Sequence, residues 1–138
     1  MKGRILVVAA LIESPERPGA FLVQQRLPGK SRALLWEFPG GKVEPGEGEP
    51  QALERECREE LAVALDVGRR LWSCVHEYAD LVVELVLYAA RIREGEGAPR
   101  PLGANELRYC TPEEMKALPF CEADLPLLEE LASGKLRA

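Results

Sequence analysis

The sequence has little of what marks a membrane-spanning or nucleic-acid-binding protein. The apolar run at residues 5–12 is eight residues long, far short of the roughly 20 residues that cross a bilayer. Lysine and arginine number 18 against 23 acidic residues, which leaves a net charge of -5 and a pI near 5.1. Non-specific nucleic-acid binding depends on basic residues that displace counterions from phosphates. We therefore expect neither a membrane nor a nucleic-acid partner.

The sequence also lacks a metal-binding or redox pattern of cysteine and histidine. Its four cysteines contain no C-x-x-C pair, and each lies in an apolar or helical context that suits a small buried side chain: Cys57, Cys74, Cys110 and Cys121. Reduced cysteines of this kind indicate a cytoplasmic protein. The single histidine, His76, has no cysteine or histidine partner nearby in sequence, so we interpret it as a packing or hydrogen-bonding residue.

Aromatic residues make up only 6% of the chain, but hydrophobic residues make up 46% of its 138 residues. Chains of this size bury about two-thirds of their unfolded surface, which is enough for one core. We predict a single domain over residues 1–138, with Trp36 and Trp72 inside it. Glu13 follows the N-terminal apolar run in place of a small-residue cleavage site, so that run is interpreted as a strand and not as a signal peptide.

Apolar and β-branched runs predict strands. Residues 4–12 and 20–26 are two such runs, separated by a turn rich in proline and glycine, and we predict that they pair with each other. Residues 71–92 are typical of a hairpin. A loop rich in glycine, proline and glutamate at residues 93–104 has a length that is often functional or mobile. A short strand follows at residues 106–110.

Three segments predict helices. Residues 50–65 begin with a proline, which suits a first helical turn, and carry one apolar face formed by Leu53, Cys57, Leu61 and Ala64. Thr111 and Glu114 form a capping-box pattern that opens a short helix, and residues 126–132 form the last. Strands before and after a central helix indicate an α/β fold, with a mixed β-sheet sandwiched between helices.

The central helix carries three acidic residues on neighbouring positions. Glu56, Glu59 and Glu60 span about 100° of a helical projection and border the apolar face. Like charges at these spacings cost roughly 0.2–0.5 kcal/mol per pair. The alternative is an ordinary solvated face, since the helix also has two ion pairs at the favourable i to i+4 spacing, Glu54–Arg58 and Arg55–Glu59.

The loop before this helix favours a metal site. The segment PGGKVEPGE contains glycines that let the backbone approach a ligand, together with Lys42 and Glu47. Carboxylate and carbonyl oxygens suit Mg²⁺ or Mn²⁺, ions that also bridge substrate phosphates. Such an ion would relieve the repulsion among the glutamates, so we predict Mg²⁺ (or Mn²⁺) as the cofactor.

At these residues the sequence resembles the Nudix hydrolase family. The family signature, G-x5-E-x7-R-E-U-x-E-E-x-G-U with U an aliphatic residue, is matched by Gly41, Glu47, Arg55, Glu56, Cys57, Glu59, Glu60, Ala62 and Val63. Two positions depart from it, because Cys57 takes an aliphatic place and Ala62 replaces the last glycine. Alanine in a left-handed cap costs about 1–2 kcal/mol. The alternative is a helix that runs on and stops at Gly68.

The likeness covers nearly the whole chain. The segments LWEFPGGKVEPGE and LPFCEADLPLLEEL, with the arginine of VQQR, resemble MutT-like nucleoside triphosphate pyrophosphohydrolases, especially the members that act on cytidine nucleotides. This resemblance implies the Nudix fold, a monomer or weak homodimer, and hydrolysis of a (deoxy)nucleoside triphosphate, a cytidine nucleotide first, to the monophosphate and pyrophosphate.

Three other functions stay open at this point. The signature specifies pyrophosphate chemistry and not the attached group, so 8-oxo-dGTP or another nucleoside diphosphate compound such as ADP-ribose are alternative substrates. A catalytically silent nucleotide-binding module is the alternative class. Retention of all three helix glutamates weighs against it.

The resemblance also implies roles for individual residues. Four groups would bind the metal: the Gly40 carbonyl and the carboxylates of Glu56, Glu59 and Glu60. Arg55 would orient the glutamates, and Glu47 would hold the loop or bind the metal through water. The general base would be Glu56, from the signature, or Glu106, from the strand after the glycine-rich loop; Glu106 is otherwise a surface residue.

Substrate contacts are predicted outside the signature. Arg26 and Lys42 are either phosphate contacts or surface cations. Asp124 matches a position that reads the base edge in relatives, where a carboxylate accepts the amino group of cytosine; its other interpretation is a helix N-cap. Phe38 and Tyr78 either stack on the base or pack in the core.

Overall fold

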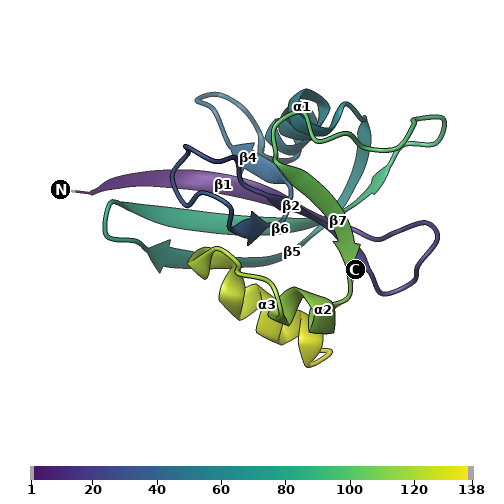
Figure 1. The fold of residues 1–138 in the computed structure, drawn as a ribbon. Coiled ribbons are helices and arrows are strands. Elements are labelled where there is room, and N and C mark those ends of the chain that lie inside the picture. The colour runs from purple at the N-terminus through teal and green to yellow at the C-terminus, as the bar shows by residue number, and fades with distance from the viewer. Residues whose placement is uncertain (1, 137–138) are drawn as a thin grey trace.

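The computed structural model describes residues 2–136 and contains two β-sheets with helices packed against them (Figure 1). The four-stranded sheet has the order β4-β1-β6-β5 and the three-stranded sheet the order β3-β2-β7. The strands are β1 (Gly3–Ile12), β2 (Phe21–Gln25), β3 (Trp36–Glu37), β4 (Gly40–Lys42), β5 (Leu65–Glu77), β6 (Leu81–Ile92) and β7 (Glu106–Cys110). The helices are α1 (Glu49–Leu61), α2 (Pro112–Lys116), the 3-10 turn η1 (Glu122–Asp124) and α3 (Leu125–Ala132).

The four-stranded sheet is mixed, as predicted. β1 runs parallel to β6, in a register from Gly3↔Leu81 to Ile12↔Ala90, and antiparallel to β4. β5 and β6 form the predicted antiparallel hairpin, which starts at Leu65 rather than at residue 71. The short connection between these strands brings the segment before Leu81 to the edge where β1 begins.

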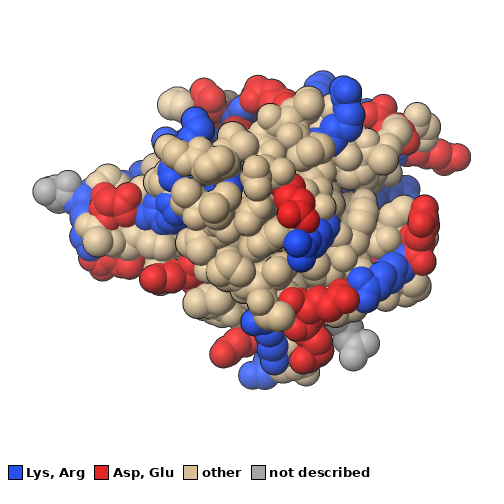
Figure 2. Space-filling view, viewed as in Figure 1, with Lys and Arg blue, Asp and Glu red and all other residues tan. Residues whose placement is uncertain are grey.

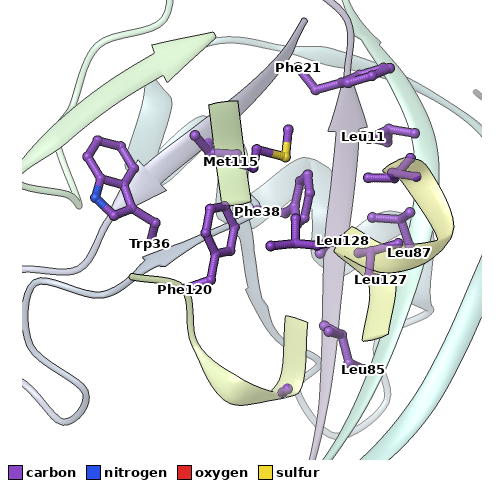
Figure 3. Packing of buried hydrophobic residues seen from close by; sticks show 14 of the residues in the cluster. Leu11, Phe21, Trp36, Phe38, Leu85, Leu87, Met115, Phe120, Leu127 and Leu128 are labelled. Carbon is purple, nitrogen blue, oxygen red and sulfur yellow. The ribbon is translucent and has the colours of Figure 1, made fainter. Parts of the chain in front are cut away.

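Alternation along β1 divides the core into two layers. Ala9 and Leu11 face a cluster that includes Phe38, Phe120 and Leu127 (Figure 3). Val8, Ala10 and Ile12 face the opposite cluster, formed with the apolar residues of α1: Ala52, Leu53, Cys57 and Leu61. Because successive strand residues point to opposite faces, α1 covers one face of the mixed sheet and α3 covers the other (Figure 1).

The predicted pairing of the first two strands is wrong. β2 belongs to the other sheet, where it pairs with β3 and β7, and it meets the end of β1 only at an isolated bridge between Glu13 and Phe21. The turn between them therefore transfers the chain from one sheet to the other. The local run of apolar residues predicted each strand correctly, but not its partner.

Helix α1 ends at Leu61, four residues earlier than predicted. Ala62 takes the left-handed conformation, with φ 59° and ψ 32°, and its N–H donates to the carbonyl of Arg58. Alanine thus occupies the cap for which the signature uses glycine, and the alternative in which the helix continues to Gly68 is wrong. Gly68 instead lies inside β5.

Ala62→Gly is expected to raise the free energy of unfolding by about 1 kcal/mol, because glycine adopts the left-handed cap without the Cβ penalty. Urea unfolding at constant pH measures the change. Ala132→Gly, at the last residue of helix α3, is the matched control and should lower stability by about 0.5–1 kcal/mol. A loss of stability in Ala62→Gly would contradict this account of the helix end.

The predicted capping box and the predicted burial of Trp36 are confirmed. Thr111 accepts from the N–H of Glu114, whose carboxylate accepts from the N–H of Thr111, which completes the capping box. Trp36 is buried, whereas Trp72 is partly buried and its indole N–H donates to Glu130. All four cysteines are free thiols. None of the helices within residues 2–136 combines the length and the apolar character that a membrane crossing requires.

Candidate active site

A cavity of about 480 Å³ lies over the start of β1 and β6 and reaches from helix α1 to the turn before α3. Its floor is apolar and consists of alternating residues of the two strands: Ile5, Val7, Ala9, Leu81, Val83 and Leu85. Most of the predicted site residues line it: Arg26, Phe38, Gly40, Lys42, Glu56, Glu60, Tyr78 and Asp124. The fold therefore brings two of the three helix glutamates, Glu56 and Glu60, and the predicted base-reading residue into one cavity.

The glycines of β4 allow Glu56 to lie against the backbone. A Cβ on Gly41 would be 2.2 Å from a carboxylate oxygen of Glu56, so any other residue there would displace this carboxylate. A Cβ on Gly40 would lie 1.9 Å from the carbonyl oxygen of Val8, and its φ of +151° is one that other residues rarely adopt. Burial raises the pKa of Glu56, against the lowering effect of Arg55.

Glu60 is the second carboxylate in the cavity. Burial, followed by the charge of Glu56, raises the pKa of Glu60 to about 7. The loop after β6 packs against it, because the backbone N–H groups of Leu102 and Gly103 both donate to the Glu60 carbonyl. A Cβ on Gly103 would lie 2.7 Å from Glu60 Cγ. This loop therefore satisfies a free carbonyl at the end of α1 and leaves room only for glycine beside the carboxylate.

Arg55 joins the loop to the helix. Its guanidinium donates to both oxygens of Glu47, at 2.7 and 2.9 Å, and to Glu56 at 2.9 Å. It also donates to the carbonyl of Lys42 at 3.0 Å. These bonds raise the pKa of Arg55, and they lower the pKa of Glu47 to about 2. Such charge-assisted, two-pronged bonds fix orientation, so the geometry has Arg55 holding Glu56 beside the glycines.

Three predicted site residues do not line the cavity: Arg55, which lines an adjoining groove, Glu59 and Glu106. Glu59 is largely exposed, 3.5 Å from Arg55, and lines the same adjoining groove of about 410 Å³, which shares Glu56 with the cavity. Glu106 pairs with Arg108 at 2.6 Å and lines neither space. Of the two candidate bases, Glu56 is the one that reaches the cavity.

The far end of the cavity holds a buried carboxyl group. Asp124 is 5% exposed and accepts a 3.3 Å hydrogen bond from the Phe38 N–H. It occupies the predicted N-cap position of α3, but its side chain makes no capping hydrogen bond. Burial, and then the charge of Glu37, raises the pKa of Asp124 well above its usual value.

Two other predicted residues have defined partners. Arg26 forms a 3.1 Å ion pair with Glu37 and donates to the Ser31 carbonyl, so it is held at the cavity wall and is not a free surface cation. Phe38 is 4% exposed and packs on Phe120 with ring centroids 5.9 Å apart. That arrangement is its core-packing alternative and leaves little of the Phe38 ring open to a base (Figure 3).

Comparisons with known proteins identify the family. Residues 8–130 match the NUDIX domain model. The chain belongs to the Nudix family. The CTP pyrophosphohydrolase of Escherichia coli strain K12 is 42% identical over 125 residues, which cover 91% of this chain and 89% of that protein. A putative 8-oxo-dGTP diphosphatase of Mycobacterium tuberculosis is 34% identical and covers 96% of this chain and 90% of its own length.

Solved Nudix structures share the fold. The solution structure of the E. coli ORF135 protein has a TM-score of 0.76 at 39% identity and covers 97% of this chain and 92% of its own. The MutT Nudix hydrolase of Burkholderia pseudomallei has a TM-score of 0.79 at 26% identity, over 94% of this chain and 99% of its own. The predicted Nudix fold and family are therefore confirmed.

Nudix hydrolases generally use divalent metals. The residues of this cavity supply part of the ligand set of such an ion. Within residues 2–136, no group of three or more Asp, Glu, His and Cys side chains is gathered closely enough to hold a metal ion. Mg²⁺, however, is usually bound by one or two carboxylates together with waters and substrate phosphates. Glu56 and Glu60, which repel each other in the same cavity, supply that partial set of hard oxygen donors.

Three charged residues that line the Nudix cavity were not predicted as site residues from the sequence: Arg32, Glu37 and Glu44. Glu37 forms an ion pair with Arg26, and its charge raises the pKa of Asp124. Arg32 stacks on the ring of Tyr78. A charged residue between Trp36 and Phe38, both of which are buried, was the available signal for Glu37. Arg32 lies in a loop with no periodic pattern, and its contact with Tyr78 exists only in the folded chain.

Proposed function

We propose that this Nudix hydrolase cleaves a (deoxy)nucleoside triphosphate, specifically a cytidine nucleotide, to the monophosphate and pyrophosphate. The observation that carries the proposal is a single cavity with Glu56 and Glu60 at one end and the buried carboxyl of Asp124 at the other. A volume of about 480 Å³ suits one small ligand. The polyphosphate would lie toward the glutamates and the base toward Asp124.

The proposed chemistry is attack of water on a phosphorus of the α–β phosphoanhydride, with pyrophosphate as the leaving group. A bound Mg²⁺ or Mn²⁺ would neutralise phosphate charge and lower the pKa of the attacking water. Glu56, Glu60 and the Gly40 carbonyl would hold it, with Glu59 reaching in from the groove. Arg55 holds Glu56 in place, and Glu56 accepts the proton of the water. Arg26 and Lys42 would contact phosphate oxygens.

Base recognition is assigned to Asp124. Because the pKa of this carboxyl is raised by burial, its protonated form is favoured, and that form offers one donor beside one acceptor. Cytosine presents a ring-nitrogen acceptor beside its 4-amino donor, so the two edges match. The 42% identity with the E. coli CTP pyrophosphohydrolase supports the choice of cytosine.

An oxidised guanine nucleotide is the second candidate. Its base edge also presents an acceptor beside a donor, and relatives in M. tuberculosis and Haemophilus influenzae, 34% and 31% identical, carry the name 8-oxo-dGTP diphosphatase. The identity with those proteins is lower than with the CTP pyrophosphohydrolase, which ranks this candidate second.

The proposal also covers the domain organisation, the oligomeric state and the cellular compartment. We propose that residues 1–138 act as one Nudix domain, as a monomer or weak homodimer, on a small nucleotide in the cytoplasm. The free cysteines support a reducing compartment. On the face seen in Figure 2, acidic and basic side chains are interspersed, which is unlike the continuous basic surface of a nucleic-acid-binding protein.

A substrate panel tests the proposal. The purified protein is incubated with Mg²⁺ or Mn²⁺ and with CTP, dCTP, 5-methyl-dCTP, 8-oxo-dGTP, UTP, ATP and ADP-ribose, and pyrophosphate and phosphate are measured separately. We expect pyrophosphate release that EDTA abolishes, with kcat/KM for a cytidine nucleotide at least about tenfold above the others. A preference for 8-oxo-dGTP would move the assignment to the second candidate. Tight binding without turnover would indicate a silent module.

A further inference from the structure

Arg32 is held over the ring of Tyr78 in the wall of the cavity. Its guanidinium carbon lies 3.7 Å from the ring centroid, and the side chain is only 18% exposed. Asp80 holds the guanidinium through a 2.6 Å ion pair with its Nη2 atom. The Tyr78 ring is itself fixed, since its hydroxyl accepts from the Ala123 N–H at 2.9 Å and its edge meets His76. Both members of the Arg32–Tyr78 stack are therefore held in place by other residues.

The loop that carries Arg32 is strained at this place. Arg32 and Leu34 both have positive φ values, 54° and 64°, which residues with a side chain seldom adopt. The Nε atom of Arg32 is buried without a hydrogen-bond partner. Strain and an unpaired buried donor both oppose folding, and such features concentrate at ligand sites. The position of Arg32 is therefore not explained by stability of the loop.

The stack lies at the base end of the cavity. The Tyr78 hydroxyl accepts a hydrogen bond from the N–H of Ala123, the neighbour of Asp124. Tyr78 also lies shortly before Leu81, which pairs with Gly3 at the start of β1. Gly41, which contacts Glu56, pairs with Val8 at the other end of the same run of β1. Gly3 and Val8 are five residue steps apart along β1, which is roughly 16 Å at about 3.3 Å per step. Figure 1 shows the β2–β3 loop on the same side as the β5–β6 turn.

We propose that the guanidinium plane of Arg32, supported by Tyr78 and Asp80, is the platform on which the nucleobase stacks. This inference rests on the proposed function and deepens it, because it names a residue that selects the base. One face of the Tyr78 ring is covered by Arg32, so Arg32 takes the stacking role that the sequence assigns to Tyr78. Guanidinium planes stack on bases much as aromatic rings do.

Two substitutions separate a stacking plane from a simple positive charge. Arg32→Lys keeps the charge and the ion pair with Asp80 but lacks the plane, whereas Arg32→Ala removes both. If Arg32 is the platform, both variants raise KM for the best nucleotide and the inhibition constant of its monophosphate about tenfold, within the range measured for lost base stacking. Both leave kcat and inhibition by pyrophosphate within about threefold. Lys30→Ala, an exposed cation of the same loop, is the matched control and should change none of these values.

Each other outcome overturns the proposal. An Arg32→Lys variant that behaves like the natural protein would show that charge, and thus phosphate, is what Arg32 contacts. A fall in kcat with KM unchanged would place Arg32 in the chemical step. Thermal unfolding of each variant shows whether the fold is intact. If the natural protein hydrolyses none of the nucleotides, the proposed function fails, and binding of CMP to the natural protein, Arg32→Ala and Arg32→Lys by calorimetry still tests the platform.

Discussion

Glu60→Gln is expected to lower kcat/KM for nucleotide hydrolysis by about 10²- to 10³-fold, since metal stabilisation of phosphate charge contributes several kcal/mol. The same change should raise the melting temperature of the metal-free protein. Glu60 is a carboxylate whose pKa is raised to about 7, first by burial and then by the charge of Glu56. Its ionisation in the folded state is unfavourable, and glutamine keeps the shape without the charge.

The sign of the pH effect follows from this raised pKa. A carboxyl group whose pKa is higher in the folded state contributes stability below its unfolded pKa, near 4.5, and loses that contribution as the pH rises to about 7. The difference between Glu60→Gln and the natural protein should therefore be small near pH 4 and grow until about pH 8. We expect a gain of about 3 °C at pH 8 in EDTA, measured by thermal unfolding.

Glu54→Gln is the matched control for this experiment. Glu54 lies on the same helix, pairs with Arg93 at 3.7 Å and lines neither the cavity nor the adjoining groove. Its substitution should leave activity within about twofold, and it should not produce a gain in stability that grows as the pH rises. Hydrolysis at the natural rate by Glu60→Gln would exclude Glu60 from the metal site. Reduced activity without the increase in stability would show that Glu60 is not unfavourably buried.

Arg55→Lys is expected to lower kcat by about 10²-fold while KM changes little. Lysine keeps the charge but cannot form the fork that binds both oxygens of Glu47 together with Glu56 and the Lys42 carbonyl. Groups that orient ligands typically contribute 10- to 100-fold, and here one group orients both the loop and Glu56. Steady-state kinetics at saturating Mg²⁺ measures the effect.

The stability of this variant should depend on pH in the opposite direction from Glu60→Gln. Hydrogen bonds from Arg55 lower the pKa of Glu47 to about 2. A carboxyl group with a lowered folded pKa contributes stability above its unfolded pKa, near 4.5, and loses it as the pH falls toward 2. The natural protein should therefore exceed Arg55→Lys in stability at pH 7, and the difference should shrink as the pH falls below about 4.

Arg17→Lys provides the control. Arg17 forms a comparable two-pronged pair with Glu114, at 2.8 Å for both bonds, and it lowers the pKa of Glu114 to about 2 in the same way. This pair lies outside the cavity and the groove. We expect the same loss of stability with a change in activity of less than twofold. Equal losses of activity in the two variants would indicate that Arg55 acts only by stabilising the fold.

The sequence by itself determined the features that depend on short spacings. The 3.6-residue period of helix α1 places Leu53, Cys57 and Leu61 in the core and the glutamates along its border. The signature from Gly41 to Val63 identified the family and the loop that Arg55 holds. The glutamates of α1 and Arg55 are close in the chain, so helical geometry alone places them beside one another.

Only the tertiary structure decided which strands pair and how the base end is built. The continuous apolar run of β1 predicts a strand with two buried faces. It does not distinguish β2 from β6 as the partner of that strand. Asp124 meets the Phe38 N–H across 86 residues, and Arg32 reaches Asp80 across 48. Contacts at such separations depend on how the two sheets and the turn before α3 pack. No local pattern encodes that packing, because many partners have the same hydrophobicity and β propensity.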